Sequence, residues 1–197
     1  MKKFILIGCL SFAALSSFSQ QTYPYNDFSS KQQKFELAKE YFQKGQYNLA
    51  YPLLKELQEG WKETDKVNSE ITSQELDYYT IVCELKQNEG RGEAEAKQYI
   101  DVVKNDARVE MMNFHLAEYY FRQQNFGYAV ALYEAANISN LSNREIADLK
   151  FHQGYSYFTL KQFAKAKPLL NAIRQVKDDP NYMDANYYYG FIAFMDK

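Results

Sequence analysis

The feature that most constrains this chain is a segment that occurs twice. Residues 113–134 read NFHLAEYYFRQQNFGYAVALYE, and residues 150–171 read KFHQGYSYFTLKQFAKAKPLLN. When the two segments are aligned, aromatic and small residues coincide along their length. The coincident pairs include Phe114 with Phe151, His115 with His152, Tyr120 with Tyr157, Phe126 with Phe163 and Ala129 with Ala166. Self-similarity at a fixed period of this size predicts stacked structural repeats.

A third copy begins at Phe35 and reads FELAKEYFQKGQYNLAYPLLKEL. Each copy has a small residue followed three positions later by an aromatic residue, and a second small residue further along. The small residues are Ala38, Ala117 and Gly154, followed by Ala50, Ala129 and Ala166. This spacing predicts two amphipathic helices joined by a tight turn before Tyr47, Phe126 and Phe163. The small residues allow the two helices to approach closely.

A degenerate fourth copy spans residues 73–103. It has Thr80 at the small position and Cys83 at the aromatic position, and we expect its turn to be stretched around residues 90–92. Capping boxes at residues 72–75 and 142–145 predict helix starts.

A fifth first helix is predicted near the end of the chain. Asp179 and Pro180 indicate its start, because proline suits the first helical position. Gly190 occupies the small position in this last helix.

This series of small and aromatic residues resembles the tetratricopeptide repeat (TPR) family, a helix-turn-helix of about 34 residues. The resemblance covers roughly residues 34–197. The family's tryptophan near the start of the first helix is missing, with Lys34, Asn113 and Lys150 at that place, and its proline after the second helix is missing too. The resemblance implies an all-α fold over residues 33–197, an α-solenoid of four stacked hairpins plus a terminal helix.

Composition agrees with a helical chain and argues against several function classes. Aromatic residues make up 17% of the chain, and Gly and Pro are scarce. No basic stripe is present, so we expect no nucleic-acid partner. The sequence has no phosphate loop, no paired-cysteine zinc spacing and no nucleophile elbow, so we predict no enzyme activity, no catalytic residues and no cofactor.

Three residues with reactive or metal-binding side chains are better explained by packing. Cys83 occupies a packing position, and we expect a buried, inert thiol. His115 and His152 recur at one repeat position, which leaves a two-ligand metal site open. No acidic residue recurs beside both, so a packed or solvated pair is the preferred interpretation, and no metal is predicted.

The first residues predict export. Two lysines precede an apolar run from Phe4 to Leu15, and small residues follow at 17–19, which is the layout of a secretory signal peptide over residues 1–19. The run is too short to span a membrane, and no later span is expected. Two alternatives stay open, a lipoprotein acylated at Cys9 and an uncleaved anchor. Residues 20–32 are polar and are predicted to be a flexible lead. We therefore expect a location in the periplasm or at the outer membrane of a Gram-negative-type bacterium.

One pattern suggests a partner-binding groove. An aromatic residue lies three positions before each small residue and another four positions after it, and two helical turns place both on one face. The resemblance implies that this face of the first helices lines a concave groove. The expected groove residues are Phe35, Lys39, Phe42, Phe114, Glu118, Phe121, Arg122, Phe151, Tyr155, Phe158, Tyr187 and Phe194. Asp77 and Glu84 would form an acidic gap in this row. The alternative is that the rings pack against neighbouring helices.

These observations favour a non-enzymatic protein–protein interaction scaffold of the cell envelope, which binds a peptide or protein partner through the groove. The alternative is that the chain is the N-terminal structural segment of a longer envelope TPR protein. The last helix has apolar residues around most of its circumference, so we also expect self-association through it or continuation into further repeats.

Overall fold

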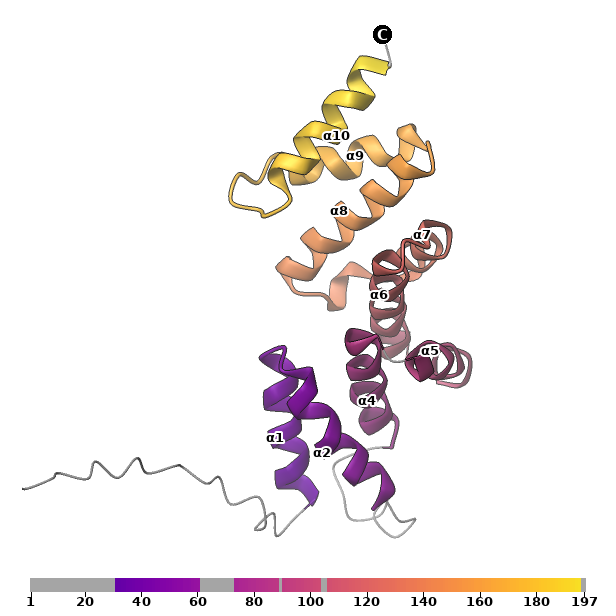
Figure 1. Cartoon of the computed structure of the whole chain (residues 1–197), viewed down its shortest axis with the longest axis vertical. Coiled ribbons are helices and arrows are strands. Elements are labelled where there is room, and N and C mark those ends of the chain that lie inside the picture. The colour runs from indigo at the N-terminus through magenta and orange to yellow at the C-terminus, as the bar shows by residue number, and fades with distance from the viewer. Residues whose placement is uncertain (1–30, 61–72, 89, 104–105, 196–197) are drawn as a thin grey trace, which may run out of the picture.

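The computed structural model describes residues 31–60, 73–88, 90–103 and 106–195. In these residues the chain forms α-helices and one short 3-10 helix, and no strand (Figure 1). The α-helices are α1 (Lys31–Gln43), α2 (Tyr47–Glu59), α4 (Ser73–Gln87), α5 (Gly90–Val102), α6 (Asp106–Arg122), α7 (Phe126–Ala135), α8 (Asn143–Thr159), α9 (Phe163–Ile173) and α10 (Tyr182–Met195), and the 3-10 helix is Ile138–Asn140. The predicted signal peptide, most of the predicted lead and Thr72 of one capping box lie outside the described residues. Lys31 and Gln32, which the sequence assigned to the lead, belong to α1.

The helices pair in chain order into four hairpins, α1/α2, α4/α5, α6/α7 and α8/α9, and α10 follows the last pair. Below, α1, α4, α6, α8 and α10 are called the first helices, and α2, α5, α7 and α9 the second helices. The hairpins follow one another along the long axis of the molecule (Figure 1). First helices contact first helices along the stack, and each second helix also packs against the next first helix. This is the TPR-like α-solenoid of four hairpins and a terminal helix that the sequence predicts.

The tight turns lie where the sequence predicts them. Gly45 adopts a left-handed φ of 70°, and Gln124 and Lys161 adopt φ values of 58° and 59° at the same repeat position. In the α8/α9 hairpin, the amides of Lys161 and Gln162 donate hydrogen bonds of 2.9 and 2.8 Å back to carbonyls of α8. This pair of hydrogen bonds ends a helix through one left-handed residue. The second helix then starts at a fixed place, at Tyr47, Phe126 or Phe163.

The α4/α5 hairpin differs from the predicted register by one residue. Asn88 has the left-handed φ of 59°, and its amide donates to the carbonyl of Leu85 at 3.2 Å. Gly45 makes the same bond to Phe42 at 2.9 Å in the first hairpin. Leu85 therefore corresponds to Phe42, which shifts every assignment in α4 by one position.

This shift corrects the predicted fourth copy. Ile81, and not Thr80, takes the place of the small residue, and Glu84, and not Cys83, takes the place of the aromatic residue. Asp77 and Glu84 consequently do not interrupt the predicted row. Their side chains bond to α2, where Gln58 donates to Asp77 at 2.7 Å and Tyr51 donates to Glu84 at 2.8 Å.

The predicted stretched turn is also wrong, because residues 90–92 form the first turn of α5. A Cβ atom on Gly92 would lie 2.9 Å from the backbone nitrogen of Leu85. The glycine is therefore required by the close approach of α5 to α4, and it does not mark a loop.

Two further helix starts were predicted. The box of Ser142 and Glu145 caps α8 as expected, with both reciprocal bonds present. The last helix begins at Tyr182, two residues later than Pro180, because the amide of Asn181 donates to the Asp179 side chain at 2.7 Å and closes a turn there.

Candidate functional site

The described residues hold no group of histidine, cysteine and carboxylate side chains arranged to bind a metal ion. Cys83 is fully buried, as predicted, and burial, with the charge of Glu84, raises the pKa of its thiol to about 12. None of the described helices has both the length and the apolar composition needed to cross a membrane. The candidate site is therefore the row of residues that the sequence placed on the first helices.

The first aromatic residue of each predicted pair is part of the core. Phe35, Phe114 and Phe151 are only 1%, 2% and 7% exposed. They are buried in the α1/α2, α6/α7 and α8/α9 hairpins, so the packing alternative holds for these three rings. Tyr187, their counterpart in α10, is 68% exposed.

In the pairs on α1, α6 and α8 the second aromatic residue is half-buried and bridges three helices. Each ring touches the first residue of its own second helix, at centroid distances of 5.3 Å for Phe42–Tyr47, 5.9 Å for Phe121–Phe126 and 5.6 Å for Phe158–Phe163. Each ring also meets a ring of the next first helix. These contacts are Phe42–Tyr79 at 4.9 Å, Phe121–His152 at 4.1 Å and Phe158–Tyr188 at 4.8 Å.

The partners from the next helix share one repeat position. We call Tyr79, His115, His152 and Tyr188 the junction rings, because each packs against the preceding first helix. This explains why the two histidines recur, because each fills a junction of its own. The sequence showed the recurrence of the histidines, but Tyr79 at this position was missed because the register of α4 was misaligned, and Tyr188 was missed because the residue type changes there.

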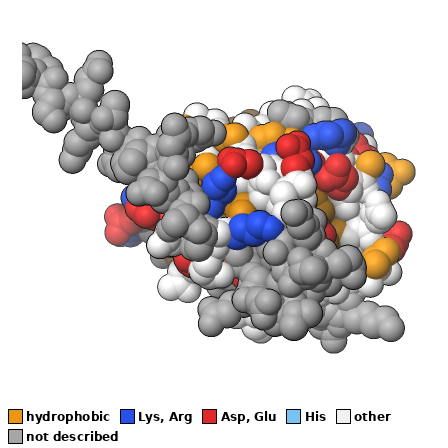
Figure 2. Space-filling model, turned by 90° about the horizontal axis from the view of Figure 1, so that it is seen from below, with side chains coloured by type: hydrophobic (Ala, Val, Ile, Leu, Met, Phe, Trp, Pro, Cys, Tyr) orange, Lys and Arg blue, Asp and Glu red, His pale blue; other side chains and the backbone are white. Residues whose placement is uncertain are grey.

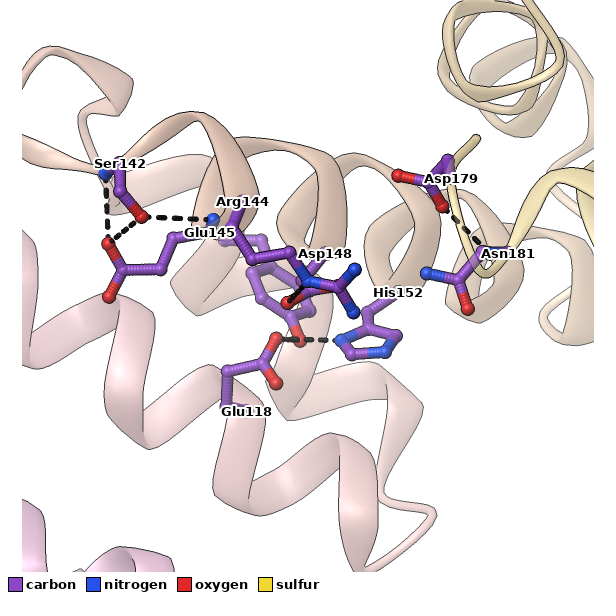
Figure 3. A network of polar contacts seen from close by, with 9 residues as sticks. Glu118, Ser142, Arg144, Glu145, Asp148, His152, Asp179 and Asn181 are labelled. Atoms are coloured by element: carbon purple, nitrogen blue, oxygen red, sulfur yellow. Dashed lines mark hydrogen bonds and ion pairs between the residues drawn. The ribbon is translucent and has the colours of Figure 1, made fainter. Parts of the chain in front are cut away.

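His152 belongs to a buried polar network (Figure 3). Its Nδ1 atom lies 2.8 Å from Oε1 of Glu118, and the hydroxyl of Tyr133 donates to the same oxygen at 2.6 Å. Burial alone would raise the pKa of Glu118, but the bonds from His152 and Tyr133 and the charges of His152 and Lys86 outweigh it and hold the pKa below its usual value. An ionised Glu118 accepts both bonds, so Nδ1 of His152 carries a proton. Glu118, predicted to border the groove, thus ties α6, α7 and α8 together.

His115 is buried at the preceding junction. Its Nε2 atom lies 3.0 Å from the hydroxyl of Tyr78, and burial, followed by the charges of Lys86 and Arg122, lowers its pKa well below the usual value. The ring is therefore neutral at pH 7. Burial also raises the pKa of Tyr78, so the hydroxyl keeps its proton and donates to Nε2. The Nδ1 atom of His115 then has no hydrogen-bond partner among the described residues.

Two cations lie beside these junctions without a carboxylate partner in the described part of the chain. Arg122 is exposed and donates to the carbonyl of Leu85 at 2.7 Å, and Lys86 makes no hydrogen bond or ion pair with any described residue. Burial lowers the pKa of Lys86, and the charge of Glu118 opposes this effect. Arg122 was predicted from the sequence, but Lys86 was not. In the corrected register of α4, Lys86 lies at the same repeat position as Arg122, and the one-residue misalignment hid this.

The remaining predicted residues differ between the two ends of the stack. Lys39 on α1 lies 3.4 Å from Glu36 and 5.4 Å from the centre of the Phe35 ring. Acidic and basic side chains lie side by side on the described part of this end (Figure 2). Tyr155 is half-buried near the other end, and Phe194 on α10 is 74% exposed.

Comparisons with known proteins bear on the fold. No protein-family model matches the chain, and no curated protein matches it. The fold is similar to the solved structure of a mutant of MamA, a TPR helical-repeat protein, with a TM-score of 0.63 over 84% of this chain and 87% of that one. The two sequences are 15% identical, so the likeness supports a shared fold and nothing finer.

Proposed function

We propose that this chain is a non-enzymatic scaffold that binds a protein or peptide partner along its first helices. Stacked helical repeats present an extended surface to protein ligands, and the TPR-like fold makes this class of function the natural one. The observation that carries the proposal is the pair of cations, Lys86 and Arg122, which pair with no carboxylate among the described residues.

The surroundings of the two cations indicate the chemistry of the partner. The half-buried ring of Phe121 precedes Arg122 directly on α6, and Tyr155 lies against it with ring centres 5.9 Å apart. A partly buried lysine with no carboxylate of the described residues within ion-pair distance is costly, and an acidic side chain from a partner would offset that cost. We infer that the partner presents an acidic residue next to apolar or aromatic side chains.

The cellular location is part of the proposal. The predicted signal peptide over residues 1–19 supports export to the periplasm or to the outer membrane, and a lipoprotein acylated at Cys9 is the alternative. A scaffold in the envelope would meet its partner there.

The experiment is affinity capture from an envelope fraction, with the captured partner identified by mass spectrometry and its affinity then measured. We expect the double variant Lys86→Ala and Arg122→Ala to bind about tenfold more weakly or worse, since a bond between charged groups contributes about 1.5–3 kcal/mol. Lys177→Ala, at an exposed residue between α9 and α10, is the matched control and should bind like the parent. An unchanged affinity in the double variant, with helicity retained by circular dichroism, would contradict the proposed site.

The second candidate is a structural segment of a longer envelope protein, which the exposed face of α10 favours. The reading frame that follows Lys197 in the gene distinguishes the two, because further repeats in frame would support the structural segment.

A further inference from the structure

Helix α10 has a large apolar face that the described residues leave mostly exposed. The exposed side chains on it are Met183 at 74%, Tyr187 at 68%, Phe191 at 42%, Phe194 at 74% and Met195 at 57%. The opposite face is buried, with Ala185 and Ile192 fully covered. An apolar face of this kind marks an interface.

The repeat shows that an equivalent position is covered elsewhere in the stack. Phe158 on α8 corresponds to Phe194 on α10. The Phe158 ring touches Phe163 of the same hairpin at 5.6 Å and Tyr188 and Phe191 of α10 at 4.8 and 5.4 Å. Phe194 has the same residue type as the half-buried Phe158, and no described helix covers it as α9 and α10 cover Phe158.

Gly190 lies in the middle of this exposed face. A Cβ atom at Gly190 would meet nothing within 4 Å, whereas at the corresponding Gly154 it would lie 3.1 Å from Cβ of Leu169 on α9. A glycine inside a helix costs about 1 kcal/mol relative to alanine. At Gly154 the glycine is needed because α9 approaches closely. At Gly190 a helix from outside the chain, packed equally closely, would require the glycine in the same way.

The other end of the stack does not complement this face. At α1 the position of the junction rings is occupied by Glu36, and Lys39 lies beside it with 25% of its side chain exposed. Stacking α1 of one copy on α10 of another would bury both charges against Tyr187 and Phe194, which is unfavourable. An open head-to-tail assembly is therefore disfavoured.

The surface that does match this face is the same face of a second copy. We propose that two copies associate tail to tail, with α10 packed antiparallel on α10 of the partner around Gly190. Such a contact is isologous and closes at two subunits. Asp184 is the only charged residue among Tyr182–Met195, and the antiparallel arrangement places the two Asp184 carboxylates at opposite ends of the interface.

The mass of the purified chain in solution tests this proposal. Light scattering at tens of micromolar should give a dimer, and the double variant Tyr187→Glu and Phe194→Glu should weaken the dimer by at least a hundredfold. Both side chains are exposed, so the variant should keep its helicity. Tyr128→Glu is the matched control, because Tyr128 is an aromatic residue that is 61% exposed on α7, and this variant should remain dimeric.

A cross-link provides the second measurement. In a chain carrying Cys9→Ser, Gly190→Cys should oxidise to a covalent dimer, and Gly127→Cys on α7 should not. A monomeric parent chain, assemblies that grow beyond two copies with concentration, or a dimer unaffected by the glutamates would each overturn the proposal.

Discussion

The hydroxyl of Tyr120 on α6 donates a hydrogen bond of 2.6 Å to Oε1 of Glu93 on α5. Lys97 completes the group, with its ammonium 2.7 Å from the same carboxylate and 5.6 Å from the centre of the Tyr120 ring. The contact joins a first helix to the second helix of the preceding hairpin, so it stabilises the stacking of hairpins rather than a single hairpin.

The other two contacts between a second helix and the next first helix also combine a tyrosine, a carboxylate and a cation. Tyr157 on α8 donates to Glu134 on α7, beside Lys165, whose ammonium lies 4.9 Å from the Tyr157 ring centre. At the α2–α4 junction the direction is reversed, since the tyrosine lies on the second helix and the carboxylate on the first. There Tyr51 donates to Glu84 at 2.8 Å, and Arg91 lies 3.2 Å from that carboxylate.

The first prediction compares two of these junctions. Glu84 is fully buried, whereas the side chain of Glu134 is 52% exposed. Tyr51→Phe should therefore lower the free energy of unfolding by about 1–3 kcal/mol, because a buried carboxylate loses a donor that water does not replace. Tyr157→Phe should cost about 1 kcal/mol or less, because water reaches Glu134. Urea unfolding measures both, and equal losses would contradict the importance of burial here.

Most of the fold can be predicted from the sequence because the pattern of one helical hairpin occurs in several copies. Three copies fix the turns before Tyr47, Phe126 and Phe163, and an error in one copy does not affect the others. The fourth copy was misaligned by one residue because its turn ends on Asn88 and its second helix starts with glycines, which in a sequence usually indicate a loop. The close packing of Gly92 on α4 is a tertiary effect, and a pattern of single residues does not reveal it.

The predicted site was identified less completely, because burial also depends on tertiary packing. Seven-residue spacing places Phe114 and Phe121 on one face of α6, but it does not show how deep each ring lies. In the pairs on α1, α6 and α8 the first aromatic is buried and the second is half-buried, whereas both aromatics of the pair on α10 are exposed. Lys86 was missed because the misaligned register of α4 hid that it occupies the same repeat position as Arg122.

The second prediction concerns the close packing at Gly154. A Cβ atom there would lie 3.1 Å from Leu169 and 3.2 Å from Leu170. Gly154→Ala should lower the free energy of unfolding by about 1–3 kcal/mol through overpacking, although alanine favours the helix. Gly127→Ala is the control, because a Cβ at Gly127 meets nothing within 4 Å, and it should be neutral or stabilising. A stable Gly154→Ala variant would show that α8 and α9 separate easily.

The third prediction is a loss of stability in mild acid that depends on His115. Its pKa in the folded chain is well below the usual value, whereas the unfolded chain has the usual value near 6.5. Below pH 6.5 the unfolded chain binds a proton that the folded chain does not, so stability decreases as the pH falls and is fully present above that value. This residue should contribute a slope of up to about 1.4 kcal/mol per pH unit until the folded pKa is reached.

The control for this prediction is His115→Gln, which keeps an acceptor for the Tyr78 hydroxyl but does not titrate. Urea unfolding of both proteins at pH 5, 6 and 7 isolates the contribution of His115, because all other titrating groups are shared. Parallel curves for the two proteins would show that His115 has the same pKa in the folded and unfolded chains, and would contradict the prediction.

The last prediction is that the exported chain begins near Gln20. The apolar run from Phe4 to Leu15 follows two lysines and precedes small residues, which is the pattern that signal peptidase recognises. Expression in a Gram-negative host, fractionation and N-terminal sequencing of the envelope material should give one start near Gln20. Cys9→Ser should leave this start unchanged, whereas a lipoprotein would lose its processing site in that variant. A mature start at an acylated Cys9, or a chain that keeps its full mass in the membrane fraction, would show that one of the two alternatives is correct.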